Sequence, residues 1–364
     1  MKFIKYILIL SILFITEKNS YSITINNDND KLINFHGKIF SKYTHPDISS
    51  IKKNVYLTYG IDAKWKLYGD TFLFWKIDYD FIKNKYQKKF KKDNNISLNI
   101  LGINLDQYQT IKYGKDDIII NSISDLRNGI DTFNKSFNFD NIIIGSKPKK
   151  VITYYNKDLY NLIPGIKLAF QKILKWNSTI LGDEIIDNFN NIKNYSNGAM
   201  ISYYIKDNYL YFIASFLRNN SIYNLNMHEK KYNTNFLGMG LKYERFPFYF
   251  SLIHGKKWNN FNLNENDKYL EKNIFDNSTI ELLTCYNFDK NIRPFLGYSV
   301  YKSKKIYDLK LIKDKEEKNI FAGTLIKINN NIETNFSYLI KLKNNKINNI
   351  DKYNNFSLIM TYKF

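Results

Sequence analysis

The side chains most able to do chemistry in this sequence are four histidines and one cysteine. Hydrolysis requires a Ser–His or Asp–His arrangement within hydrogen-bond reach. Of His36, His45, His228 and His254, only His36 lies in the middle of a predicted strand on its interior side, and no serine nucleophile motif accompanies it. Cys285 lies in an apolar run, which favours a packed side chain over a reactive thiol. The sequence contains no C-x-x-C, H-E-x-x-H or G-x-x-x-x-G-K motif, so it predicts no cofactor and no metal site.

Lysine is the other residue type that could define a function. The chain has 54 Lys and Arg residues against 34 Asp and Glu residues, a formal net charge of +20. Such an excess suits a polyanion such as a nucleic acid. The lysines are dispersed among abundant Asn and Ile, however, and no nucleic-acid-binding module is recognisable. We therefore attribute the charge to overall composition and expect no nucleic-acid partner, although the charge would still shape any pore.

The N-terminus has the pattern of a secretory signal peptide. Two lysines precede an apolar run, Ile7 to Ile15, and Ser22 follows at a spacing typical of signal cleavage. The apolar run is far shorter than the roughly 20 residues that a membrane-spanning helix needs. We expect a cleaved signal peptide at residues 1–22 and an exported mature chain at 23–364.

Apolar and polar residues alternate along most of the remaining chain. The alternating runs are roughly 8 to 12 residues long and often end at Asn, Asp or Lys, which is typical of β-strands separated by turns. Asn329 to Asn331 is one such turn, and Asn suits it because it tolerates positive φ. We predict sixteen strands, near 31–42, 53–67, 70–82, 96–105, 108–115, 142–155, 165–175, 198–206, 208–216, 235–244, 246–255, 278–289, 291–302, 318–328, 332–342 and 354–364.

Short turns between these runs alternate with long connections, among them 83–95, 116–141, 217–234, 256–277 and 303–317. This asymmetry is typical of an outer-membrane barrel. In lipid every backbone donor and acceptor must be paired within the protein, and a closed sheet of strands achieves this. The fold class is therefore an all-β, antiparallel transmembrane barrel that forms one domain. A soluble β-sandwich or β-helix has the same period, but it leaves unexplained the strand number and the 30 Tyr, 27 Phe and 4 Trp residues.

The last run, FSLIMTYKF, shows the alternation clearly. Its interior side carries Ser357, Thr361 and Lys363, and its lipid side carries Phe356, Leu358, Met360, Tyr362 and Phe364. A free edge in lipid would leave backbone groups unpaired, so we expect this strand to close onto the first one.

These segments resemble the trimeric general-diffusion porins of the Gram-negative outer membrane, of the enterobacterial porin C/F type. KLINFHGKIF is similar to the opening strand of that family, with an aromatic-x-Gly-Lys step at Phe35, Gly37 and Lys38. LGINLDQYQTIKYGK resembles the stretch leading to the family's Tyr-Gly-Arg, and SNGAMISYY, GLKY, NIRPFLGYSVYKSK and the terminal TYKF follow in the same order. The resemblance implies a sixteen-stranded barrel and a homotrimer in the cell outer membrane. It also implies a non-enzymatic channel that passes ions and small hydrophilic solutes.

The resemblance also implies a constriction, in which a third loop folds into the barrel and carries acidic groups that face a basic wall. Such a transverse field screens solutes by size and charge. By position the loop is 116–140, with Asp125 and Asp131 as the acidic candidates. Two arginine positions of the family are Thr58 and Ser97 here, and the expected basic wall consists of Lys38, Lys64, Lys66 and Lys147. A lysine-rich wall predicts a pore that is less cation-preferring than an acidic porin.

Two partners follow from the same resemblance. The family's terminal aromatic strand is read by the barrel-assembly machinery, which assigns that signal to Tyr362 and Phe364. The lysine-rich loop near Ile82 to Asn95 lies where the family contacts a neighbouring subunit, and its lysines also suit lipopolysaccharide phosphates.

Two other functions stay open at this point. A sugar-specific channel requires an inward aromatic track, whereas the four tryptophans are scattered along the chain. An outer-membrane hydrolase requires the catalytic arrangement that the histidines do not supply.

Overall fold

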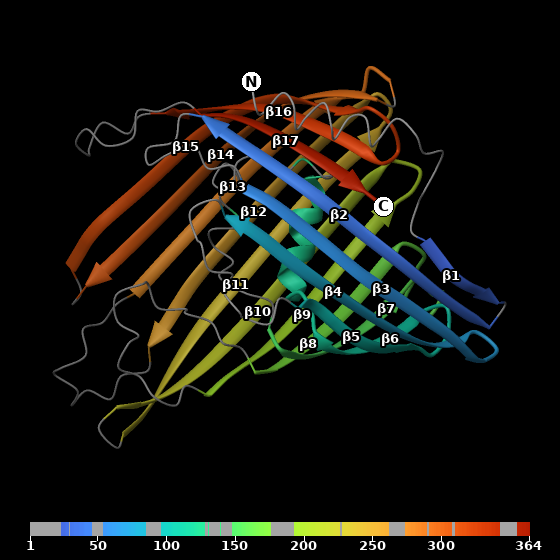
Figure 1. The fold of residues 1–364 in the computed structure, drawn as a ribbon. Helices are drawn as coiled ribbons and strands as arrows, with labels where there is room; N and C mark the ends of the chain where they lie inside the picture. The colour runs from blue at the N-terminus through green and yellow to red at the C-terminus, as the bar shows by residue number, and fades with distance from the viewer. Residues whose placement is uncertain are drawn as a thin grey trace.

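The computed structural model of the chain describes residues 23–28, 30–45, 54–84, 96–127, 130, 139, 148–175, 193–225, 228–261, 274–289, 291–307, 310–342 and 355–364. The expected signal peptide, residues 1–22, lies outside this range. The described strands run antiparallel to their neighbours and wrap around a closed wall (Figure 1).

Sixteen strands form this wall in sequence order, and each overlaps a predicted strand. Residues 142–147 of the strand predicted at 142–155 lie outside the described residues. Two predicted long connections, 217–234 and 303–317, were wrong, because strands 210–225 and 228–245 extend over the first and strands 292–307 and 310–327 over the second, where Asn- and Lys-rich sequence obscures the alternation. The strands are β2 (Lys31–His45), β3 (Asn54–Tyr68), β4 (Thr71–Asn84), β5 (Ile96–Asn104), β6 (Gln109–Lys115), β7 (Lys150–Lys157), β8 (Ile166–Lys175), β9 (Lys193–Ile205), β10 (Leu210–Leu225), β11 (His228–Arg245), β12 (Phe248–Phe261), β13 (Ile274–Tyr286), β14 (Ile292–Tyr307), β15 (Lys310–Lys327), β16 (Ile332–Leu342) and β17 (Asn355–Lys363).

The barrel closes between its last and first wall strands, as predicted. β17 pairs with β2 from Phe356 opposite His45 to Lys363 opposite Lys38. The ladder continues one step further, because the backbone N–H of Phe364 donates to the Gly37 carbonyl at 2.9 Å. Closure leaves neither strand with an open edge over this stretch.

A short additional strand, β1 (Ile23–Asp28), covers the rest of β2. It pairs antiparallel with β2 from Ile23 opposite Phe35 to Asp28 opposite Lys31. β1 therefore begins where β17 ends, and together the two strands pair the full length of β2. This strand was not predicted, because ITINND is short, rich in Asn and without a strong apolar alternation.

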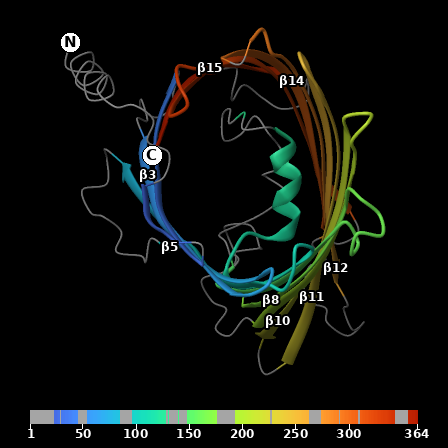
Figure 2. The same ribbon diagram turned by 90° about the vertical axis from the view of Figure 1, so that its right-hand side faces the viewer.

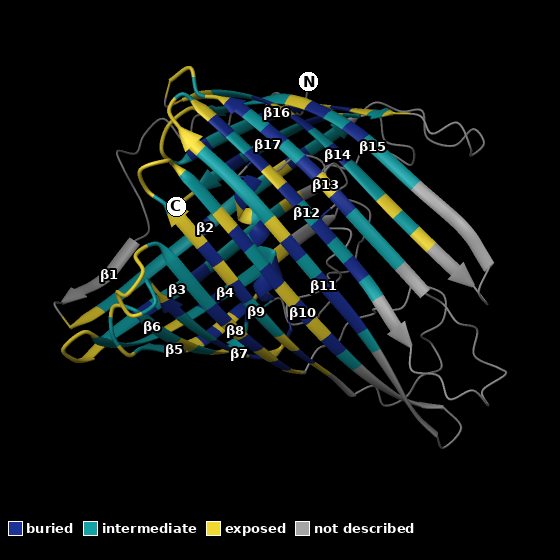
Figure 3. Ribbon diagram, turned by 180° about the vertical axis from the view of Figure 1, so that it is seen from behind, coloured by how far each residue is buried: buried dark blue, intermediate teal, exposed yellow. Residues whose placement is uncertain are grey.

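Residues along many of the strands alternate between more buried and more exposed positions (Figure 3). The β13–β14 ladder aligns Glu281, which is 2% exposed, with the fully buried Ser299. On the other side of the same strands, Ile280 and Leu296 are about half exposed. In β17, Ser357 is buried and Phe356 is exposed, as the alternation predicts. The exterior is apolar and the interior carries the polar groups, which is the arrangement of a barrel in lipid.

One helix, η1 (Ile119–Arg127), lies inside the barrel (Figure 2). It belongs to the 116–140 segment that was expected to fold inward, and it contacts strands β8 to β12. The helical form was not predicted, since the sequence reading treated the whole segment as loop. No helix among the described residues is long and apolar enough to cross a bilayer.

Phenylalanine rings cover glycines directly across the interior ladder. On β14 and β15 the pairing is reciprocal, with Phe295 opposite Gly323 and Gly297 opposite Phe321. A Cβ built on Gly297 would lie 2.0 Å from the Phe321 ring, and one on Gly323 would lie 2.5 Å from the Phe295 ring. Both rings are nearly or fully buried. The glycines therefore provide the space into which the opposite rings pack, an arrangement known to stabilise glycine within sheets.

We predict that Gly297→Ala destabilises the barrel by about 1–3 kcal/mol, because the new methyl group forces the buried Phe321 ring out of its position. The measurement is the temperature at which the folded protein, in detergent, loses its compact mobility on a semi-native gel. Leu296→Val, on the lipid side of the same strand, is the matched control and should change that temperature far less. Equal shifts for the two variants would contradict this role of the glycine.

Candidate pore constriction

The inserted helix is held by apolar contacts with the interior wall. Ile119, Ile123 and Leu126 are almost completely buried and form one cluster with wall residues of β7 to β12. Glycines on the wall make room for them, since a Cβ at Gly238 would lie 2.2 Å from Ile123 and one at Gly240 would lie 2.1 Å from Leu126. At these two glycines the helix side chains pack directly against the backbone of β11. The position of the helix depends on close packing, which tolerates little displacement.

A second apolar cluster extends this filling towards β16. Ile130 packs there with Tyr249, Leu283, Phe295, Phe321, Leu339 and Cys285. Cys285 is buried among them, as the apolar run around it predicted. Apolar side chains and the inserted segment therefore occupy the interior along β8 to β16. Charged side chains also lie on the interior of this part of the wall, among them the buried Glu281 on β13 and Lys257 on β12. The predicted basic residues that the structure describes lie on β2 and β3.

Gln171 on β8 anchors the beginning of η1. Its side-chain oxygen accepts a hydrogen bond from the backbone N–H of Ile119 at 2.9 Å. Its amide group donates to the Asp117 carbonyl at 3.0 Å and to Thr153 Oγ1 at 3.1 Å. One buried amide thereby satisfies backbone groups on both sides of the helix start, which a helix terminus requires.

Glu281 on β13 anchors both sides of the loop tip. Its Oε2 accepts from Arg127 Nη2 at 2.9 Å and from Arg127 Nε at 3.2 Å, and its Oε1 accepts from the backbone N–H of Phe139. The Glu281 side chain is 2% exposed and that of Arg127 is 10% exposed. One buried carboxylate thus joins two chain positions that lie on either side of residues 128–138. Glu281 was not predicted as a functional residue. A single acidic residue at an interior position of the apolar strand TIELLTC does, however, indicate a buried carboxylate with a partner.

The two acidic candidates of the loop differ in what the structure describes. Asp131 lies outside the described residues. Asp125 lies on η1, where partial burial and the nearby Asp117 carboxylate raise its pKa above the usual value, while Lys167 opposes that effect. Protonation of Asp125 therefore begins at a higher pH than for an ordinary carboxylate.

Three of the four predicted basic residues are described, and Lys147 is not. The ammonium group of Lys38 lies 5.5 Å from the centre of the Phe40 ring, and that of Lys64 lies 3.8 Å from the Phe72 ring. Lys66 is exposed near the short β3–β4 turn, next to a register shift between Lys66 and Tyr68. Lys38 pairs with Thr58 across the ladder, whereas Lys64 and Lys66 lie closer to the turn. The structure thus spreads these lysines along the wall.

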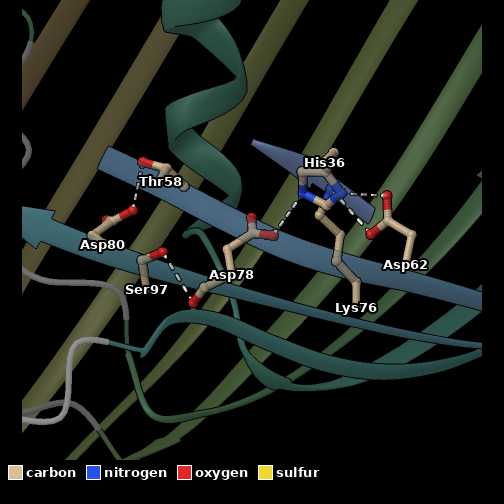
Figure 4. Close-up of polar contacts among 7 residues, drawn as sticks. All are labelled: His36, Thr58, Asp62, Lys76, Asp78, Asp80 and Ser97. Atoms are coloured by element: carbon tan, nitrogen blue, oxygen red, sulfur yellow. Dashed lines mark hydrogen bonds and ion pairs between the residues drawn. The ribbon is translucent and has the colours of Figure 1, made fainter. Parts of the chain in front are cut away.

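The same wall carries acidic residues that the prediction did not include (Figure 4). His36 Nε2 is 3.0 Å from Asp78 Oδ1, and His36 Nδ1 is 3.5 Å from Asp62 Oδ2. Asp80 accepts a hydrogen bond from Thr58 at 2.8 Å. Asp78 and Asp80 alternate along KIDYD on β4, so their interior position was readable from the sequence. The β2–β4 wall is therefore mixed in charge.

A further basic group lies on β6 to β8, near the start of the inserted segment. Lys112 and Lys167 lie on the same Tyr155 ring, at 4.8 and 4.7 Å from its centre. Lys112 also forms an ion pair with Asp116 at 2.6 Å. These lysines were not predicted. Lys112, Tyr155 and Lys167 lie on three different strands, and only the pairing of β6, β7 and β8 brings them together.

Comparisons with known proteins agree with this architecture. The sequence model of the family described as Gram-negative porin matches residues 30–364. The porin-like protein BU359 of Buchnera aphidicola is 23% identical over 326 residues, which cover 85% of this chain and 83% of that protein. Salmonella typhi OmpF, solved as a complex with daunomycin, has a TM-score of 0.73 at 17% identity and covers 94% of this chain and 100% of its own. An anion-selective porin from Comamonas acidovorans has a TM-score of 0.63 at 11% identity, covering 92% of this chain and 100% of its own.

We predict that Glu281→Ala destabilises the folded protein by about 3–5 kcal/mol, because it leaves the Arg127 guanidinium buried without its carboxylate. The double variant Arg127→Met, Glu281→Met should lose less than Glu281→Ala, because it buries no unpaired charge. Thermal unfolding in detergent measures both effects, and single-channel recording should show more frequent closures in Glu281→Ala.

Glu333→Gln is the matched control for this clamp. Glu333 is also an interior glutamate, paired with Lys363 at 2.9 Å, but the Lys363 side chain is 48% exposed. Exposed ion pairs contribute at most about 1 kcal/mol. A loss in Glu333→Gln as large as that in Glu281→Ala would contradict the assignment of the clamp to Glu281.

Proposed function

This chain belongs to the Gram-negative porin family, and from that premise we propose how its pore selects solutes. It forms a water-filled channel in the outer membrane for passive diffusion of ions and small hydrophilic solutes. The observation that carries the function is the closed barrel with an apolar exterior, a polar interior and an inserted segment that narrows the lumen. A channel of this kind selects solutes by the width of its lumen and by the electric field of the residues that line it.

The constriction lies between the inserted segment and the wall of β2 to β8. Asp125 and Asp131 form its acidic side, and the lysines of the opposite wall form its basic side, Lys38, Lys64, Lys66 and Lys147, to which we add Lys112 and Lys167. The apolar clusters along β8 to β16 support this proposal, because they hold the inserted segment against that side of the wall and narrow the lumen there.

The placement of the lysines favours anions. Lys38, Lys64 and Lys167 lie over aromatic rings. A cation–π contact positions an ammonium group and leaves its charge in place. A carboxylate partner also positions the ammonium group but cancels its charge. The formal net charge of +20 acts in the same direction. One fold relative, the Comamonas acidovorans protein, is described as an anion-selective porin.

The outer face of β2 to β4 is the proposed contact surface of a homotrimer. Tyr59 stacks on Tyr79 at 5.3 Å and on Phe81 at 5.5 Å between ring centres. Flat, rigid aromatic surfaces of this kind are enriched at protein interfaces. Export through residues 1–22, recognition of Tyr362 and Phe364 by the assembly machinery, and lipopolysaccharide contact complete the proposal.

The alternative functions receive less support from the geometry. The described partners of His36 are the carboxylates of Asp62 and Asp78, with no serine hydroxyl in hydrogen-bond contact. Trp75 and Trp258 occupy the exterior parity of β4 and β12, where they do not form a track for sugars. We therefore propose a channel without a bond-making step and without a sugar ladder.

Planar-bilayer recording of the purified protein tests this proposal. We expect stepwise ohmic conductance, unaffected by maltodextrin, and a reversal potential under a KCl gradient that indicates chloride preference. Lys167→Gln should reduce the chloride-to-potassium permeability ratio by about twofold, because it removes one positive charge from the pore wall. Lys172→Gln is the matched control, because Lys172 lies on the exterior parity of the same strand.

Clear potassium preference in the unmodified protein would overturn the proposed anion selectivity. A purified, folded protein that inserts into bilayers without conducting would overturn the open channel itself.

A further inference from the structure

We propose that His36, Asp62, Lys76 and Asp78 form a proton-responsive selectivity step on the pore wall. This pore-wall quartet deepens the proposed channel function and rests on it. Within it, protonation of the His36 imidazole shifts the channel further towards anions.

The quartet spans three adjacent strands (Figure 4). His36 lies on β2, Asp62 on β3, and Lys76 and Asp78 on β4. His36 reaches across β3 to Asp78 above Gly60, where a Cβ would lie 2.2 Å from Asp78 Oδ1 and 2.8 Å from His36 Nε2. Any side chain at position 60 would fill the space through which these two groups meet. The glycine therefore permits a direct contact between strands that are not neighbours.

The imidazole has a carboxylate at each of its two nitrogens. Asp78 Oδ1 is 3.0 Å from Nε2 and Asp62 Oδ2 is 3.5 Å from Nδ1. A neutral imidazole has a single N–H and can donate to only one of them, whereas the imidazolium form can donate to both. Lys76 Nζ lies 3.4 Å from the other oxygen of Asp62. The geometry therefore accommodates both charge states of His36 with the same neighbours.

The charge of the quartet depends on that imidazole. Its two carboxylates outnumber its single ammonium group, so the quartet is negative while His36 is neutral, and protonation cancels the excess. Histidine is the side chain that ordinarily changes charge between pH 5 and 8. The other charged groups at interior positions of the surrounding strands are Lys38 and Lys42 on β2, Lys64 and Lys66 on β3, Asp80 on β4, and Lys363 on β17. None of these ordinarily titrates in that range.

The quartet is accessible to ions in the lumen. The side chains of His36, Lys76 and Asp62 are 26%, 38% and 42% exposed, and Asp78 is 17% exposed. Among the described residues, no group of three or more His, Cys, Asp or Glu side chains is arranged to hold a metal ion. In this proposal the proton changes the charge of the quartet, and ions that pass the wall experience the resulting field.

Reversal potentials at pH 8.0 and pH 5.5 under a KCl gradient test this step in the reconstituted full-length mature protein. We expect the chloride-to-potassium permeability ratio of the unmodified channel to rise on the order of twofold on acidification. His36→Gln keeps a polar side chain of similar reach and should lose most of that rise. This variant also separates the effect of the imidazole from that of carboxylates such as Asp125, whose pKa is raised by partial burial. His254→Gln is the matched control, because His254 lies on the exterior parity of β12, and it should keep the full rise.

Asp78→Asn provides a second variant in case His36→Gln does not fold. It removes one of the two carboxylates, so its permeability ratio at pH 8.0 should already resemble that of the acidified unmodified channel. A full rise in His36→Gln, or an unchanged ratio at pH 8.0 in Asp78→Asn, would overturn the inference while leaving the channel intact. Failure of the unmodified protein to conduct would instead overturn the proposed function, and this step with it.

Discussion

The structure depends on one constraint, that backbone hydrogen-bonding groups in lipid must find partners within the protein. Closing the sheet between β17 and β2 meets this requirement along most of the wall. β2 is longer than β17, and the part of β2 that β17 does not reach would present an open edge. The short strand β1 pairs with this stretch and ends the exposure. Both chain segments adjacent to the closure therefore have the same physical role, despite lying at opposite ends of the sequence.

Closure also creates an interior, and backbone pairing does not determine which side chains line it. Strand alternation alone would line the lumen with polar groups, as for Ser299 and Ser357. Along β8 to β16, however, interior isoleucine, leucine and phenylalanine side chains pack against one another and against η1. Glycines such as Gly238 make this close approach possible, and the buried Arg127–Glu281 pair fixes where the helix ends. The inserted segment and the apolar side chains packed against it consequently narrow the lumen from one side.

Strand alternation was sufficient to predict all sixteen wall strands, because a period of two is a property of each strand by itself. It also placed His36 on the interior correctly. What it could not predict are contacts that depend on register between strands. His36 and Asp78 are 42 positions apart, and Arg127 and Glu281 are 154 apart. The helix η1 was missed for a related reason, since its isoleucines match a wall surface that exists only after the barrel has closed. The prediction for this wall named its lysines but not the carboxylates beside them, because those contacts also depend on the register between strands.

The central claim is that alternate residues of one strand face water and membrane, and single-cysteine labelling tests it most directly. In a Cys285→Ser background, cysteines are introduced one at a time along β4, at Lys76, Asp78, Tyr79, Asp80 and Phe81, and the protein in intact membranes is treated with a charged, membrane-impermeant thiol reagent. We expect rapid labelling at positions 76, 78 and 80 and little at positions 79 and 81, because the former face the lumen and the latter the apolar exterior. Uniform labelling along the strand, or a maximum at every third or fourth position, would contradict the barrel and the pore built within it.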